Sequence, residues 1–313
     1  MKAKRKQERA QENAAHHYER TQLPSLMQLW QESWELFAKT VGSYTKLIGV
    51  VFLILIFGAM LGLLFGLSIA FSSFNVPFQM LFHPTPFRIA TWMLLLIWFI
   101  AYVITLILIS LFFPIASIVV LREKRIISLR NLLTRAKGFV LPYLLTGLLV
   151  SFIVIGGYTL FIVPGILFSV LFLFWMYEVV LEKQSGKSAI AASYLLVKNY
   201  FWETLIRVLI LNIGIMLLSG ILTRLAKDSA IVMIASIIFS LLAGWFAQVY
   251  LYTLYMQIKE TALSNKTISF RWIWIISVLG WAFFLVGVTF VFWIIITYFV
   301  SGTHTTPPTH PIV

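Results

Sequence analysis

Residue types that could carry out catalysis are few in this sequence, and they form no recognisable pattern. Acid–base pairs, metal sites and activated nucleophiles need histidine, carboxylate, thiol or hydroxyl side chains at matched spacing. The chain contains no cysteine, so disulfides and thiolate ligands are absent. Its histidines all fall in polar segments: His16, His17, His83, His304 and His310. We therefore expect no catalytic residue, no metal site and no cofactor.

Serine offers no better nucleophile. The serine–glycine pairs at 185–186, 219–220 and 301–302 have no histidine or lysine partner within a hydrophobic stretch. A serine nucleophile needs such a base beside it, and a glycine-rich phosphate loop is also missing. We therefore do not expect an intramembrane protease or a nucleotide-dependent enzyme.

Charged side chains within the long apolar stretches are limited to Glu178, Glu203 and Arg207, all close to polar segments. Glu178 precedes and Arg207 follows a short connection, so a Glu178–Arg207 pair inside the membrane is one interpretation. The alternatives are that Arg207 extends its side chain to the interface, or that these residues bind a ligand or headgroup. Asn212 and Gln248 lie deeper, where polar side chains usually form interhelical hydrogen bonds.

Composition places the whole chain in a membrane. Of its 313 residues, 60% are hydrophobic and 11% are charged, and the mean hydropathy is +0.94. Soluble domains carry roughly 25% charged residues, so a soluble enzyme is excluded. Long uncharged runs are typical of spanning helices. The sequence predicts an all-α, polytopic transmembrane helix bundle.

Seven spans are predicted, at about 47–71, 89–113, 140–160, 166–182, 201–222, 230–256 and 273–299. Residues 138–177 form an uncharged run of 40 residues. A single helix of that length would measure about 60 Å, twice the hydrocarbon core. This run must therefore cross twice, and we expect it to turn at Pro164 and Gly165. Pro114 is expected to kink or end the second span.

Segments outside the spans include two tails and amphipathic interfacial helices on the cytoplasmic side, at 22–45, 122–137 and 187–200. We expect disordered tails at 1–21 and 301–313, an interfacial helix at 22–45 and a transmembrane domain at 46–300. Apolar residues in 22–45 recur at helical spacing and include two tryptophans, which favour the membrane interface. Within the first span, Gly58, Gly62 and Gly66 form a ridge that allows close approach of another helix.

The formal charge of +13 is explained by topology without a nucleic-acid partner. With the N-terminus in the cytoplasm and the C-terminus outside, only Arg88, Arg224 and Lys227 of the loop residues fall outside, in agreement with the positive-inside rule. The densest basic cluster is predicted to contact anionic lipid headgroups in the cytoplasmic membrane. It comprises Arg122, Lys124, Arg125, Arg130, Arg135 and Lys137.

A pattern recurs three times along the chain. Ser25, Ser128 and Ser188 each begin a basic, amphipathic stretch that leads into a pair of spans, and the seventh span follows the third pair. Two interpretations remain open: a true internal repeat, or the common appearance of cytoplasmic loops.

Residues 161–205 contain a Pro164-Gly165 turn, Glu178, a Ser185-Gly186 loop, a small-residue helix at 191–193 and Trp202. This segment resembles bacterial integral membrane proteins related to the glycerophosphoryl diester phosphodiesterase membrane domain. The resemblance extends over roughly 22–258. In the proteins that name that family, the domain is joined to a soluble barrel, which needs about 250 residues. No soluble segment of that size exists here, so the resemblance does not imply phosphodiesterase activity.

Together these patterns predict a non-catalytic integral membrane protein that acts as a scaffold, sensor or regulatory module and contacts anionic lipid. The alternative is a transporter or channel for a small or lipidic solute, with its site between spans 4, 5 and 6. A transporter would contain a water-accessible cavity that reaches polar residues such as Asn212. Protein partners and homo-oligomerisation are left open.

Overall fold

The computed structural model describes residues 23–74, 86–124, 128–225, 230–261 and 271–302. All regular structure in these ranges is helical, which confirms the all-α prediction. Seven helical segments among the described residues are long and apolar enough to cross a membrane, so the chain is a multi-pass membrane protein. The helices are α2 (Leu26–Phe74), α3 (Pro86–Glu123), α4 (Leu129–Lys137), α5 (Val140–Leu160), α6 (Ile162–Leu171), α7 (Trp175–Leu181), α8 (Lys187–Lys198), α9 (Phe201–Leu225), α10 (Ala230–Thr261) and α11 (Arg271–Gly302).

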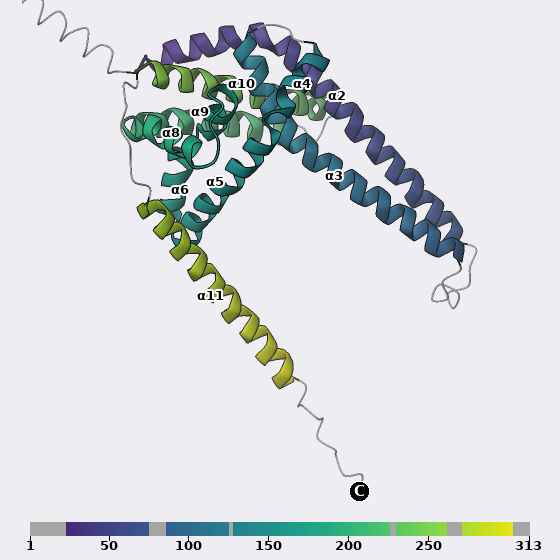
Figure 1. The fold of residues 1–313 in the computed structure, drawn as a ribbon. Coiled ribbons are helices and arrows are strands. Elements are labelled where there is room, and N and C mark those ends of the chain that lie inside the picture. Colours follow the sequence, from purple (N-terminus) through teal and green to yellow (C-terminus); the bar gives the residue numbers. More distant parts are fainter. Residues whose placement is uncertain (1–22, 75–85, 125–127, 226–229, 262–270, 303–313) are drawn as a thin grey trace, which may run out of the picture.

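Most of the chain is organised as helical hairpins (Figure 1). α2 and α3 form the first hairpin. α4 precedes a second hairpin made of α5 and α6–α7, and α8 precedes the third, made of α9 and α10. α11 packs along α5. This order of elements matches the three amphipathic stretches followed by paired spans that the sequence indicates.

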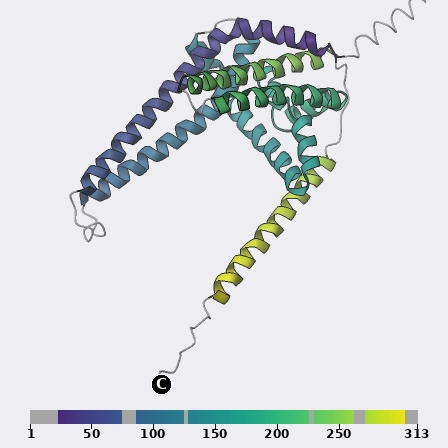
Figure 2. The same ribbon diagram turned by 180° about the vertical axis from the view of Figure 1, so that it is seen from behind.

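α2 differs from the sequence prediction because it is one continuous helix. The predicted interfacial helix at 22–45 and the first span at 47–71 belong to the same 49-residue element. No proline interrupts the backbone hydrogen bonds there, so nothing forces the helix to end near Lys46. The helix instead changes direction, and its N-terminal part runs across the end of the molecule from which the hairpins extend (Figures 1 and 2).

The turn between α5 and α6 also lies elsewhere than predicted. The helices are separated by Phe161, whose backbone is extended (φ −160°, ψ 157°). Pro164 and Gly165 lie in the first turn of α6, where a proline is tolerated because the first N–H groups of a helix lack intrahelical partners. Gly165 is needed for packing instead, since a Cβ there would collide with Tyr158 of α5.

Pro114 and the fourth span show further differences. α3 continues past Pro114 to Glu123, so the proline lies inside the helix. The predicted span at 166–182 consists of α6 and α7, which are separated by a short turn before Trp175.

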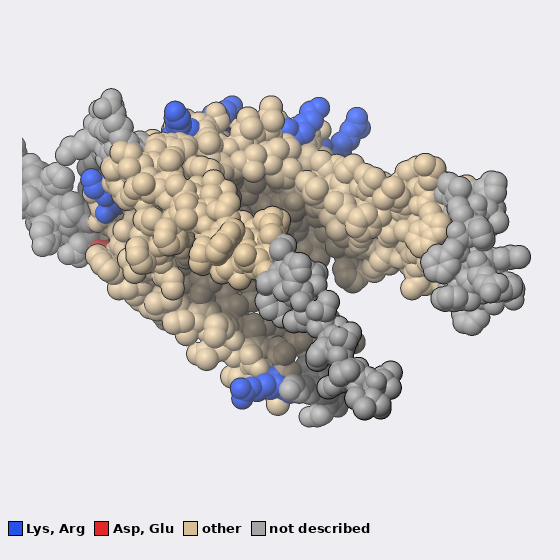
Figure 3. All heavy atoms as spheres, turned by 90° about the horizontal axis from the view of Figure 1, so that it is seen from below, with Lys and Arg blue, Asp and Glu red and all other residues tan. Residues whose placement is uncertain are grey.

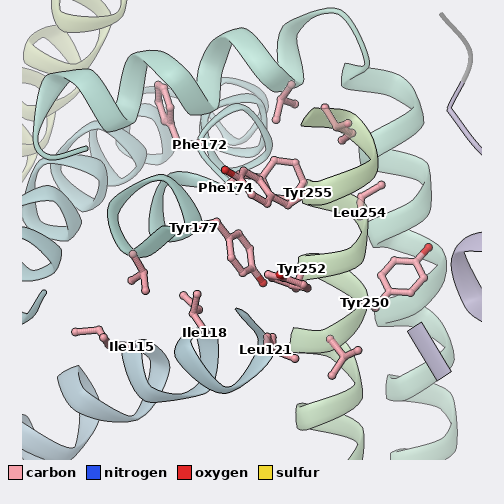
Figure 4. Close-up of a cluster of buried hydrophobic side chains, with 14 of the residues drawn as sticks. Ile115, Ile118, Leu121, Phe172, Phe174, Tyr177, Tyr250, Tyr252, Leu254 and Tyr255 are labelled. Atoms are coloured by element: carbon pink, nitrogen blue, oxygen red, sulfur yellow. The ribbon is translucent and has the colours of Figure 1, made fainter. Parts of the chain in front are cut away.

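The buried core lies where the three hairpins converge. It is formed by residues 115–121 of α3, by residues 172–180, which include the turn before α7 and most of α7, and by residues 245–258 of α10. We call this region the hub. Figure 4 shows Tyr177 beside Tyr252 and Tyr255, with Ile115, Ile118 and Leu121 of α3 on the adjacent side. Tyr177 and Tyr255 stack with ring centroids 5.2 Å apart. Each hairpin therefore contributes the end of its second helix to one shared core.

Away from the hub the helices bury little surface. The α2–α3 hairpin extends away from the rest of the molecule, as does most of α11 (Figures 1 and 2). The surface in Figure 3 is mostly uncharged, with basic side chains at its margins. Exposed apolar side chains cover 52–67 of α2 and 283–296 of α11, as expected for helices that face lipid.

Small residues mark the places where helices approach closely. A Cβ at Gly58 or Gly62 would collide with Tyr102 or Trp98 of α3, whereas Gly66 has no atom within 4 Å. Two of the three predicted ridge glycines thus lie against α3. Sequence reasoning missed a second such contact, between Gly156 of α5 and Gly280 of α11. There the Trp281 indole donates a hydrogen bond to the Phe152 carbonyl at 3.0 Å.

Candidate lipid-binding surfaces and buried polar groups

α4 carries Arg130, Arg135 and Lys137, half of the predicted basic cluster, and it is fixed to the hub. Leu132 and Ala136 of α4 are buried, and an ion pair joins Arg135 to Glu123 at the end of α3. Ser128 immediately precedes α4 and forms no side-chain capping bond there. α4 is therefore held by one apolar face and one ion pair.

The opposite face of α4 combines basic and apolar side chains. Arg130, Leu133 and Lys137 follow one another at three- and four-residue steps, so they share a face, and all three are exposed. Arg122 and Lys124 nearby are also exposed, whereas Arg125 lies outside the described residues. Lys124 ends α3 with a positive φ of 51°, a backbone conformation that often terminates helices.

Glu178 lies in the hub and is 3% exposed. The Tyr255 hydroxyl of α10 donates a hydrogen bond to its carboxylate at 3.1 Å. The Lys259 ammonium donates to the same hydroxyl at 3.5 Å and forms an ion pair with Glu182. These contacts join α7 to α10, so Glu178 belongs to a polar network that connects two hairpins.

Arg207 on α9 is 7% exposed and bonds elsewhere. Its Nη2 donates to the Pro24 carbonyl at the start of α2, at 2.6 Å, and the Tyr250 hydroxyl donates to its backbone carbonyl at 3.5 Å. The predicted Glu178–Arg207 pair is therefore not formed, because Glu178 faces α10 and Arg207 faces the N-terminal end of α2. The Arg207 side chain is thus directed toward the segment just before α2.

An apolar groove begins beside Arg207. It has a volume of about 660 Å³ and lies between the N-terminal part of α2, α9 and α10. Its lining includes Trp30 and Trp34 of α2, Leu211 and Gly214 of α9, and Phe246 of α10. The Trp30 and Phe246 ring centroids are 4.8 Å apart. The groove thus has aromatic side chains along one wall and aliphatic side chains along another.

The groove does not have the character expected of an aqueous transport route. Asn212 is not among its lining residues, and its side-chain amide donates to the Val208 carbonyl of the same helix at 2.8 Å. Asn212 therefore forms no interhelical hydrogen bond within the described part of the chain, contrary to the expectation from sequence. Among the described residues, no group of three or more His, Asp or Glu side chains could hold a metal ion.

Sequence reasoning missed the groove because its walls are distant in the chain. α2 and α9 are separated by more than a hundred residues, and nothing local indicates that they meet. One usable signal existed: Thr204, Arg207, Leu211, Gly214 and Leu218 recur at alternating steps of three and four. That spacing places polar and apolar residues on one face of α9.

Searches of protein-family models, curated proteins and solved structures found no match to this chain.

Proposed function

We propose that this protein is a non-catalytic module of the cytoplasmic membrane of a bacterium, which acts as a scaffold or sensor and binds anionic lipid through α4. The observation that carries the proposal is the arrangement of α4. Leu132 and Ala136 fix the helix to the hub, while Arg130, Leu133 and Lys137 project from its other face. An exposed leucine between two basic residues suits the boundary between acyl chains and anionic headgroups.

The orientation of the protein is part of the proposal. With α4 and α8 on the cytoplasmic side, the basic loops lie where the positive-inside rule favours them. Seven spans then place the C-terminus outside. Because the chain contains no cysteine, single cysteines at Ala3 and Ser301 can be labelled from either side of the membrane. Labelling of both positions from the same side would contradict the orientation.

Lipid binding through α4 is tested with Arg130→Gln and Lys137→Gln, singly and together, in nanodiscs of phosphatidylcholine and phosphatidylglycerol. Each basic residue near an anionic surface contributes about 1 kcal/mol, so each change should lower phosphatidylglycerol enrichment around the protein about fivefold. Higher salt should weaken the enrichment in the unaltered protein, because surface charges are screened.

Arg224→Gln is the matched control. Arg224 is also exposed, but it lies at the far end of α9, so its removal should leave the enrichment unchanged. If the α4 variants retain as much phosphatidylglycerol as the unaltered protein, the cluster is only a topology signal.

We also propose that the protein has no catalytic activity. This proposal is supported by the bonding of Glu178, whose carboxylate accepts a structural hydrogen bond from Tyr255. Purified protein should not hydrolyse glycerophosphodiesters. Turnover that is lost on substitution of a single residue of this chain would refute that expectation.

A transporter of polar solutes is less well supported than a scaffold. The groove beside α9 is apolar, and Asn212 is hydrogen-bonded within its own helix. A lipidic occupant fits these walls better than water or an ion does.

A further inference from the structure

One face of α9 combines unpaired polar atoms with an apolar groove. Thr204, Arg207, Leu211, Gly214 and Leu218 lie on this face, which we call the α9 stripe. Among the described residues, Thr204 Oγ1 and Arg207 Nη1 are buried side-chain atoms without a hydrogen-bond partner. The last three residues of the stripe line the groove. The stripe therefore has a polar end and an apolar end.

The polar end contains no ion pair among the described residues. The Pro24 carbonyl that accepts from Arg207 is neutral, and no ion pair joins Arg207 to a carboxylate in the described part of the chain. Glu203, one turn earlier on α9, is exposed, and its charge partly compensates the Arg207 guanidinium without forming an ion pair. A buried cation whose charge is only partly compensated is unfavourable. A guanidinium binds phosphate especially well, because its parallel N–H groups match the phosphate oxygens.

The N-terminus of α9 favours an anion at the same place. Thr204 lies in the first turn of this 25-residue helix, together with the exposed Glu203, and Arg207 lies in the second turn. The helix dipole attracts negative charge to the first turn. This effect adds to the two unpaired side-chain donors. A phosphate beside Thr204 and Arg207 would accept hydrogen bonds from both side chains.

The apolar end has the length of one acyl chain. From Arg207 to Leu218 the helix rises about 16 Å at 1.5 Å per residue. One leaflet of a hydrocarbon core about 30 Å thick measures about 15 Å. The groove volume of about 660 Å³ is also within the usual range of roughly 300–1,000 Å³ for ligand sites.

Gly214 keeps the middle of the groove open. A Cβ at this position would have no neighbouring atom within 4 Å, so the glycine is not required for close packing between helices. Trp30 and Trp34, both partly exposed, stand at the groove wall contributed by α2. Tryptophan prefers the headgroup level of a bilayer. Because Arg207 bonds to Pro24, just before the helix that carries these tryptophans, the polar end of the stripe is expected at the same level.

From these observations we infer that the groove between α2, α9 and α10 is a binding site for an anionic phospholipid. Its phosphate lies beside Thr204 and Arg207, and one acyl chain lies along Leu211, Gly214 and Leu218. The inference does not rest on the proposed role of α4, since the two surfaces share no residue.

The test uses phosphatidylglycerol that carries a photoreactive diazirine in the middle of one acyl chain, in nanodiscs of phosphatidylcholine. After irradiation, mass spectrometry should locate the label on the groove residues of α9 and α10. Gly214→Leu fills the groove and should reduce labelling there about tenfold. That change corresponds to a loss of about 1.4 kcal/mol in the free energy of lipid binding. Gly220→Leu is the control, because Gly220 also has no neighbouring atom within 4 Å but does not line the groove.

Arg207→Gln should lower labelling by the phosphatidylglycerol probe about tenfold, the effect of losing one charge-assisted hydrogen bond. Arg207→Lys keeps the charge and should retain part of the labelling. A matched phosphatidylcholine probe should label the groove weakly and respond little to either change. The α4 variants should leave groove labelling intact, which separates this site from the proposed function.

Five results would overturn the inference. The label could spread evenly over the lipid-facing helices, or it could be unaffected by Gly214→Leu. Equal labelling by the phosphatidylcholine probe would remove the role of the anionic headgroup. Displacement of the probe by oleate, or an increase in groove labelling after deletion of residues 1–22, would assign the groove to a fatty acid or to the chain's own N-terminal segment.

Discussion

Glu178 and Arg207 are both buried and charged, yet they differ in what surrounds them. Glu178 accepts a hydrogen bond from the Tyr255 hydroxyl. The same hydroxyl accepts a hydrogen bond from the Lys259 ammonium. Arg207 donates to one neutral carbonyl and keeps an unpaired nitrogen. A buried charge with complete partners holds helices together, whereas one with incomplete partners leaves free energy available for a ligand. The difference separates a structural network in the hub from a candidate binding site on α9.

The largest effect is expected at Glu178. Glu178→Ala leaves the Tyr255 hydroxyl and Lys259 without the buried acceptor and opens a cavity between α7 and α10. We expect the free energy of unfolding to fall by about 3 kcal/mol, the upper range for loss of a buried polar partner. Thermal unfolding of the purified protein in detergent measures this change.

Two companion variants show whether the loss is specific to the network. Tyr255→Phe removes only the hydroxyl and should cost about 1 kcal/mol. Glu35→Ala removes an exposed carboxylate that pairs with Lys39 on the same helix, and it should change stability by less than about 0.5 kcal/mol. Equal effects of Glu178→Ala and Glu35→Ala would mean that the hub network does not stabilise the fold.

Arg207 should behave in the opposite way. Replacement of an incompletely paired buried charge by an apolar side chain of similar volume is often neutral, so Arg207→Met should change the free energy of unfolding by less than about 1 kcal/mol in neutral detergent. Added phosphatidylglycerol should stabilise the unaltered protein by about 1.4 kcal/mol at tenfold excess over its dissociation constant.

The Arg207→Met variant should lose that lipid-dependent stabilisation, and thermal unfolding with and without lipid measures both quantities. A large loss of stability in detergent alone would show that the bond to Pro24, rather than a ligand, is the main role of Arg207.

The sequence was sufficient to predict the features that depend on local composition. Long apolar runs predict the seven spans, because the free energy of transfer into lipid accumulates residue by residue along a helix. The basic residues and leucines of 129–137 likewise predict the amphipathic α4, whose Leu132 and Ala136 are buried while Arg130 and Lys137 are exposed.

Features that depend on neighbours in space could not be predicted in the same way. Glu178 and Arg207 are near each other in sequence, but Tyr255 and Pro24 are their partners. Pro164 and Gly165 indicate a turn by residue type, yet packing against Tyr158 explains the glycine. Partner choice depends on which helices pack together, and a single sequence with no matched relative does not contain that information directly.

The smallest expected effect concerns Gly214, and it tests why the α9 stripe contains a glycine. Alanine in the interior of a helix is more favourable than glycine by about 0.5–1 kcal/mol, because glycine loses more backbone entropy on folding. An added Cβ at Gly214 meets no atom within 4 Å, so Gly214→Ala should raise the free energy of unfolding by up to that amount. Thermal unfolding in neutral detergent measures the gain, and Gly280→Ala is the contrast, because its Cβ would collide with the Gly156 backbone.

If Gly214→Ala stabilises the protein yet weakens labelling by the phosphatidylglycerol probe, the glycine lowers helix stability in favour of an open groove, a trade-off common at binding sites. If it destabilises the protein, another part of the chain closes against α9 at this point, and Arg207 stands beside a packed interface rather than a lipid site.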